Sequence, residues 1–163
     1  MLTDENLVIR QADPASRDCR AMIEALDRLQ ESLYPAAENY LDSVEELQKS
    51  NCYFLAAYRG HQIVGCGALK IVDGMYSELK RMYVAADQRQ LGIGQRLLAA
   101  LEAHAAKSGM RLVRLETGVS QPEALALYRR NGYKEIEAFG EYSHSASSVF
   151  MEKRLPDDYP PVP

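Results

Sequence analysis

The sequence predicts a mixed α+β fold, with a central and mostly antiparallel mixed sheet of about seven strands flanked by about four helices. Strand-like runs alternate with segments of helical period along residues 7–155. Three strand-like runs in the middle of the chain are separated only by short turns, as in an antiparallel meander. The length of 163 residues and a hydrophobic content of 47% suit one domain with a sizeable core. We therefore expect a single domain over residues 1–155.

The first half of the chain supplies one strand, two helices and the meander. Residues 7–12 alternate enough to form a strand, and a helix then starts at Asp13-Pro14, with apolar residues at helical spacing as far as Leu33. Ser43 can cap a second, short helix that ends near Asn51. The meander strands are expected over residues 52–58, 62–72 and 77–84.

The second half supplies two longer helices and three strands. A helix over about residues 93–108 has one apolar face and stops at Gly109. Pro122 marks the first turn of a fourth helix, which reaches Asn131-Gly132. The remaining strands are expected over residues 111–116, 133–137 and 148–155. The proline-rich residues 156–163 suit neither a helix nor a central strand, so we expect an extended or disordered tail.

The charge balance argues against nucleic acid as a partner. The chain has 19 basic and 23 acidic residues, for a net charge of -4, and so offers no basic surplus for a phosphate backbone. The first residues lack the basic head and apolar core of a signal peptide, and no later segment approaches the roughly 20 apolar residues of a membrane span. We expect a cytoplasmic protein with no membrane contact.

The cysteines and histidines do not predict a metal site. Cys19, Cys52 and Cys66 show no C-x-x-C spacing, and we interpret all three as structural. The three histidines are scattered, with no second histidine at a helical ligand spacing. We therefore expect no metal cofactor.

The most informative segment joins the strand over 77–84 to the third helix. It reads Gln-Arg-Gln-Leu-Gly-Ile-Gly over residues 88–94, so two glycines stand where a helix begins. Backbone amides and the positive end of a helix dipole bind anions at such a turn, which predicts a ligand with phosphates. A P-loop is excluded because Gly94 is followed by Gln95, and a dinucleotide fingerprint is weak because position 97 is leucine. An ordinary strand-to-helix turn remains the alternative.

Residues 89–94 resemble the pyrophosphate turn of the GNAT superfamily of acetyl-CoA-dependent N-acetyltransferases, although Gln90 stands where many members carry glycine. Residues 124–133 are similar to the family's Leu-Tyr-x-x-x-Gly-Tyr/Phe segment, and the element order is similar to the whole GNAT fold. The chain looks like a compact, stand-alone bacterial member. The resemblance implies acetyl transfer from acetyl-CoA to a primary amine of a small molecule or protein, and makes a homodimer plausible. It implies that these residues bind the cofactor: Met82, Tyr83, Val84, Arg89, Gln90, Leu91, Gly92, Ile93 and Gly94.

The same resemblance assigns two catalytic roles. Glu78 precedes the phosphate turn and is the candidate base, because neutralising an alkyl amine at pH 7 costs roughly 4.6 kcal/mol. A surface glutamate, or one paired with Lys80 on the same strand face, is the alternative. Tyr128 is the candidate acid for the leaving thiolate, and a core tyrosine is its alternative. No serine, cysteine or histidine stands in a nucleophile-base arrangement, which favours direct attack in a ternary complex.

The acceptor is expected to contact two loops, over residues 34–40 and 140–147. Tyr34, Glu38 and Tyr142 are the candidate contacts and would suit a cationic amine, although exposed polar loops commonly have this composition. A non-catalytic acyl-CoA sensor and a protein interaction module with the same fold are the alternative functions.

Overall fold

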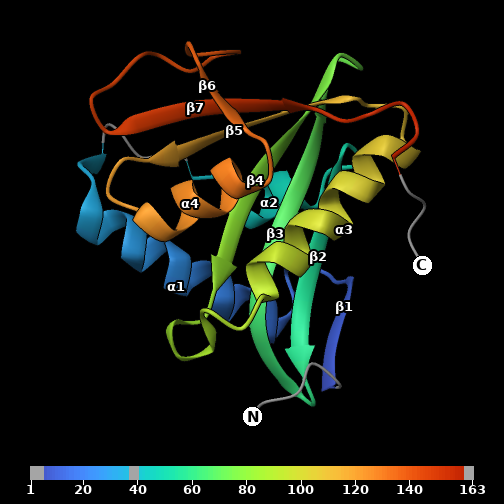
Figure 1. Cartoon of the computed structure of the whole chain (residues 1–163). Coiled ribbons are helices and arrows are strands. Elements are labelled where there is room, and N and C mark those ends of the chain that lie inside the picture. The colour runs from blue at the N-terminus through green and yellow to red at the C-terminus, as the bar shows by residue number, and fades with distance from the viewer. Residues whose placement is uncertain (1–5, 37–40, 160–163) are drawn as a thin grey trace.

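The computed structural model describes residues 6–36 and 41–159, and these form the predicted mixed α/β architecture around one seven-stranded sheet (Figure 1). The strands are β1 (Leu7–Gln11), β2 (Cys52–Arg59), β3 (Gln62–Val72), β4 (Tyr76–Val84), β5 (Leu112–Gly118), β6 (Lys134–Ile136) and β7 (Ser148–Arg154). The helices are α1 (Arg17–Leu33), α2 (Val44–Leu47), α3 (Ile93–Lys107) and α4 (Pro122–Arg130), with a short 3-10 turn η3 at Ala86–Gln88. The predicted order of strands and helices is confirmed.

Local capping chemistry sets the helix ends. Ser43 accepts a hydrogen bond from the Glu46 N–H and caps α2 as predicted, while Pro122 occupies the first turn of α4. The prediction that the first helix starts at Asp13 was wrong by one turn. The Ser16 side chain caps α1 instead, accepting from the Cys19 N–H, and the Asp13 carboxylate accepts from the Ala15 N–H in the turn before it.

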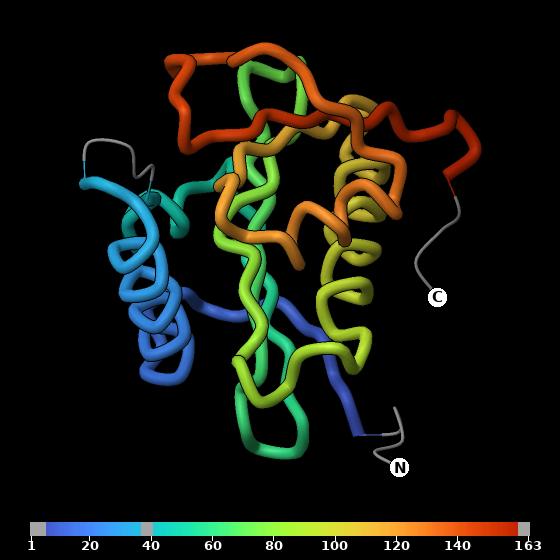
Figure 2. Tube along the Cα trace, turned by 60° about the vertical axis from the view of Figure 1, so that its left-hand side comes forward, coloured from blue at the N-terminus to red at the C-terminus, as the bar shows by residue number. Residues whose placement is uncertain are grey.

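The sheet has the order β1-β2-β3-β4-β5-β7-β6, and its pairs are antiparallel except for β4 with β5. Figure 2 shows α1 and α3 on opposite faces of this sheet. The larger core lies under α3 and α4, and a second core lies under α1 and α2. The apolar face predicted for the third helix is confirmed, because its five members are all buried: Ile93, Leu97, Leu98, Leu101 and Ala105.

The feature that creates a site is the gap between β4 and β5. These strands pair only from Ser77 to Leu79, and beyond Leu79 they run apart, as Figure 1 shows. A bulge in β4 follows directly: the register against β3 shifts between Cys66 and Ala68, and Arg81 has a positive φ of 56°. The second half of β4 therefore has an open edge on its β5 side.

The end of the described chain is packed. The Tyr159 N–H donates to the Pro156 carbonyl at 3.1 Å, which makes a turn where an extended tail was expected. The Tyr159 hydroxyl donates to the buried carboxylate of Glu102 at 3.4 Å, and Lys153 and Tyr133 also bind this carboxylate. A buried charge needs such partners, which explains why this part of the tail returns to the domain. Residues 160–163 lie outside the described chain.

Candidate active site

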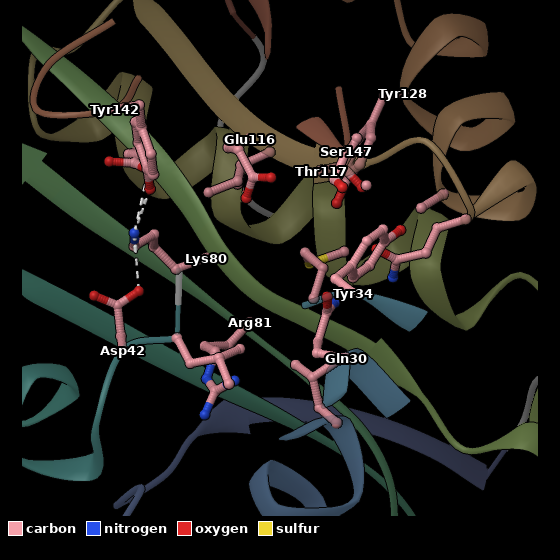
Figure 3. Close-up of a pocket in the computed structure, with 18 residues that line it drawn as sticks. Gln30, Tyr34, Asp42, Lys80, Arg81, Glu116, Thr117, Tyr128, Tyr142 and Ser147 are labelled. Carbon is pink, nitrogen blue, oxygen red and sulfur yellow. Dashed lines mark hydrogen bonds and ion pairs between the residues drawn. The ribbon is translucent and has the colours of Figure 1, made fainter. Parts of the chain in front are cut away.

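Two cavities meet at the gap between β4 and β5. The first, which we call the turn cleft, has a volume of about 630 Å³ and lies between the second half of β4, the turn over residues 88–94 and α4. The second, which we call the polar pocket, has a volume of about 70 Å³ and lies between α1, β4, β5 and the loop before β7 (Figure 3). Both cavities are lined by Met82, Gln121, Ala124 and Tyr128.

The turn of the cleft presents the N-terminus of α3. Gly92 caps this helix in the left-handed conformation, with φ of 81°, and the first turn of the helix carries no acidic residue. Gln90 also has a positive φ, of 64°, so it adopts the conformation that favours glycine. The departure from the family pattern at Gln90 therefore leaves the shape of the turn intact, at a cost in backbone strain.

Arg89 fastens this turn to the end of β4. Its Nε donates to the Val84 carbonyl at 3.0 Å, and its guanidinium lies over the Tyr83 ring and 3.9 Å from the exposed carboxylate of Glu123. The side chain is one-third exposed at the cleft. Arg89 thus holds the turn and adds positive charge beside it.

In the polar pocket, Glu78 belongs to a network of buried charges. Its Oε2 accepts from Lys80 at 3.2 Å and from the Tyr142 hydroxyl, while Lys80 also binds Asp42 at 2.9 Å. Glu78 is 5% exposed, so it is not a surface residue. The structure thus contains the ion pair with Lys80 that was the alternative for Glu78. Burial lowers the pKa of Lys80, but its acidic neighbours outweigh burial and raise it.

Glu116 enters the same pocket from β5. Figure 3 shows its side chain between Tyr142 on one side and Thr117 and Tyr128 on the other, directed toward the middle of the pocket. Burial raises the pKa of Glu116, and neighbouring Glu78 raises it further, while Ser148 and Lys80 lower it. Within residues 6–36 and 41–159, Glu116 forms no ion pair.

Tyr128 stands where the two cavities join. Its ring packs in the larger core and meets Tyr133 edge to face, as the alternative of a core tyrosine requires. Its hydroxyl nevertheless reaches the cavities and forms no hydrogen bond within the described chain. Burial raises the pKa of Tyr128, and the nearby Glu116 carboxylate adds to the rise. The phenol therefore stays protonated and is available to a ligand.

Tyr34 and Gln121 form the wall between α1 and the start of α4. The Tyr34 hydroxyl donates to Gln121 Oε1 at 3.2 Å and accepts from the Ser120 N–H at 3.1 Å, and Gln30 also donates to Gln121. The hydroxyl of Tyr34 thus fixes the loop that follows β5.

An ion pair ties α1 to the bulge of β4. Arg81 of the bulge binds Asp27 of α1 at 2.6 Å.

Comparison with known proteins identifies the family. The model of the acetyltransferase (GNAT) family matches residues 20–133. This chain belongs to the GNAT family of acetyltransferases. This chain is 41% identical over 151 residues to the IAA acetyltransferase of Azospirillum brasilense, and the match covers 92% of this chain and 99% of that relative.

Solved structures show the same fold. A crystal structure from Klebsiella pneumoniae is 38% identical, has a TM-score of 0.80, and is matched over 91% of this chain and 97% of that chain. An N-acetyltransferase from Thermoplasma acidophilum, solved in complex with coenzyme A, has a TM-score of 0.71 at 23% identity, over 91% of this chain and 99% of that chain. The second comparison supports the GNAT fold alone.

The structure brings most of the predicted site residues together. All the predicted cofactor contacts except Leu91 line the turn cleft, and the Leu91 side chain is among the exposed apolar ones. Glu78, Tyr128, Tyr34 and Tyr142 line the polar pocket. Glu38 lies outside the described residues.

Sequence reasoning missed two of the pocket residues that matter most, Glu116 and Gln121. The strand period predicts only that Glu116 shares a strand face with Arg114, and the divergence of β4 and β5 that opens space beside Glu116 leaves no local signal. In the described part of the chain, no group of three or more His, Cys, Asp or Glu residues could hold a metal ion. No described helix is long and apolar enough to cross a membrane.

Proposed function

We propose that this GNAT acetyltransferase moves the acetyl group of acetyl-CoA directly to a primary amine while both substrates are bound. The junction of the two cavities carries this proposal, because Met82, Gln121, Ala124 and Tyr128 line both. A thioester in the turn cleft and an amine in the polar pocket would meet beside the Tyr128 hydroxyl. Proximity of this kind replaces a bimolecular encounter by a step within one complex.

Acetyl-CoA suits the turn cleft in two respects. The amides over residues 89–94 and the N-terminus of α3 would hold the pyrophosphate. The open edge of β4 at Met82–Val84 would pair with the amide groups of the pantetheine arm, as an added strand pairs with a sheet edge. A fold neighbour that binds coenzyme A supports the same choice of cofactor.

Direct attack fits the side chains that surround the cavities. Among the described lining residues there is no cysteine or histidine that could form an acyl-enzyme. Cys66 is buried in the second core, where burial raises the pKa of its thiol to about 12. A backbone N–H of the β4 edge would stabilise the oxyanion, and Tyr128 would protonate the leaving thiolate. Glu78, the candidate base from the sequence, stays a prediction.

The experiment is thiol release from acetyl-CoA with a panel of polyamines, amino acids, aminoglycosides, arylamines and peptide N-termini. IAA joins the panel because the Azospirillum brasilense relative is named for it. Acetyl transfer to one class of amine is the expected result. If no acceptor gives thiol release but calorimetry shows that acetyl-CoA still binds, the protein is instead an acyl-CoA sensor.

The predicted homodimer and the cytoplasmic location stay predictions. Sedimentation velocity of the purified protein would measure the oligomeric state, and fractionation of the source cells would test the compartment.

A further inference from the structure

We propose that Glu116, and not Glu78, is the base that accepts the proton of the acceptor amine. This inference rests on the proposed acetyl transfer and names a catalytic residue for it.

Position favours Glu116. In the register of the parallel pair, Glu78 lies opposite Arg114, inside the short paired region. Glu116 lies beyond Leu115, the last paired residue of β5, and therefore where the strands have separated. Glu116 also acts electrostatically on Tyr128 and Tyr34, whereas Glu78 is not among the groups that shift the pKa of Tyr128. A base beside Tyr128 is close to the thioester carbon that the amine attacks.

Glu78 is already bound by other side chains of the protein. One of its oxygens accepts hydrogen bonds from both the Lys80 ammonium and the Tyr142 hydroxyl, and Lys80 also pairs with Asp42. These two bonds hold Oε2 of Glu78 to groups of the protein itself. The network instead joins the loop that bears Tyr142 to β4, which gives Glu78 a positioning role at the wall of the pocket.

The Glu116 carboxylate has the surroundings of a base. It forms no ion pair in the described chain. The groups around it are Glu78 and Lys80 of β4, Tyr128 of α4, Tyr34 just after α1, Tyr142 of the loop before β7 (Figure 3) and Ser148 of β7. Burial raises its pKa toward the working pH, where a carboxylate accepts protons most effectively. Geometry and environment thus point to the same residue.

The proposed sequence of steps balances. The ammonium of the acceptor gives one proton to the Glu116 carboxylate, and the freed nitrogen lone pair forms a bond to the thioester carbon. The C–S bond then breaks, its electron pair goes to sulfur, and Tyr128 protonates the thiolate. The second proton of the attacking nitrogen returns to the Tyr128 phenolate, and the Glu116 carboxylic acid releases its proton to water. The products are the N-acetyl amine, the free thiol of coenzyme A and one proton.

The test compares Glu116→Gln with Glu78→Gln as the matched control, using two small probe amines at saturating acetyl-CoA. Ethanolamine is mostly protonated at pH 7 and needs a base, whereas hydroxylamine is already neutral at that pH. Glu116→Gln is expected to lower kcat/KM for ethanolamine by about 10²- to 10⁴-fold and to leave hydroxylamine within about 10-fold of the wild type. Glu78→Gln is expected to affect the two probes alike.

Calorimetry with acetyl-CoA shows whether each variant keeps a folded turn cleft. Three results would overturn the assignment while acetyl transfer by the wild type still stands. In Glu116→Gln, kcat/KM could fall equally for both probes or fall for neither. In Glu78→Gln, kcat/KM could fall for ethanolamine alone. A wild type that acetylates neither probe nor any amine of the panel would overturn the proposed function itself, and this inference with it.

Discussion

The ring of Tyr34 packs directly onto the backbone of Gly118, in the space that any side chain at position 118 would occupy. A Cβ atom built on Gly118 would overlap the Tyr34 hydroxyl and the ring atoms beside it. The glycine at the end of β5 is therefore required by the side chain of the residue that follows α1, 84 positions earlier in the chain (118 minus 34). This contact fixes the wall of the polar pocket.

Gly118→Ala is expected to destabilise the protein by about 1–3 kcal/mol, because overpacking of this kind forces neighbours out of place. Urea unfolding measures the loss. Tyr34→Ala removes the overlapping ring, so the double variant should lose less stability than the sum of the two single variants. Strict additivity of the two losses would show that the two residues do not compete for this space.

Tyr128→Phe is expected to slow thiol release by about 10²- to 10⁴-fold, because the proton for the leaving thiolate is lost. Stability and acetyl-CoA affinity should not change, since the Tyr128 hydroxyl has no hydrogen bond within the described residues. Tyr133→Phe is the matched control: its hydroxyl donates to the buried Glu102 at 3.1 Å, so this variant should lose stability and keep its turnover. Full turnover in Tyr128→Phe would exclude the acid role.

Gly92→Ala tests the phosphate turn. A Cβ at Gly92 would meet no atom within 4 Å, so the effect comes from the positive φ of 81° alone, which costs a residue other than glycine about 1–2 kcal/mol. We expect weaker acetyl-CoA binding by calorimetry. Gln90→Gly is the control in the same turn, where φ is 64° and glycine relieves strain, so binding should be retained. Unchanged affinity in Gly92→Ala would remove this turn from the cofactor site.

Asp27→Ala is expected to destabilise the protein by about 2 kcal/mol, because it leaves the guanidinium of Arg81 without its partner. The Arg81 side chain is 4% exposed, and two of its nitrogens already lack a hydrogen bond in the described structure. Arg81→Met removes the charge and those nitrogens together and should cost less. Thermal unfolding of the two variants makes the comparison, and a larger loss in Arg81→Met would contradict it.

Glu116→Gln is expected to raise the melting temperature near pH 7. The folded-state pKa of Glu116 lies above its unfolded value because burial opposes the charged form, so the wild type loses stability as the pH rises through the folded pKa. Below the unfolded pKa, wild type and variant should be equally stable. Melting temperatures from pH 4 to pH 8 therefore should diverge as the pH increases, and parallel curves would contradict the buried, raised carboxylate.

Local sequence determined most of the element boundaries. The limits of β3 agree with the prediction because the turns on either side break an otherwise continuous apolar run, and Ser43 marks the start of α2 through one side-chain bond. The cofactor turn was predictable for the same reason, since two glycines and a helix start lie within a few residues.

Features that depend on distant segments were not predictable. The placement of β7 between β5 and β6 follows from long-range pairing, which no local pattern encodes. Glu78 is held in a network that includes Tyr142 and, through Lys80, Asp42. Glu116 lies instead where β4 and β5 have separated, so two glutamates have different surroundings for reasons that no local pattern encodes. Tyr159 likewise returns to the fold because of Glu102, which lies 57 positions earlier.

The open edge of β4 means that the sheet is incomplete in the protein alone. Amide groups along Met82–Val84 on that side have no neighbouring strand, and such groups exchange their hydrogens readily with water. A cofactor that pairs with this edge would act as a removable strand and would stabilise the folded state by RT ln(1 + c/Kd), where c is its concentration and Kd its dissociation constant, an amount that grows with the logarithm of c over Kd. The stability of this enzyme would then rise with the supply of its own acetyl donor.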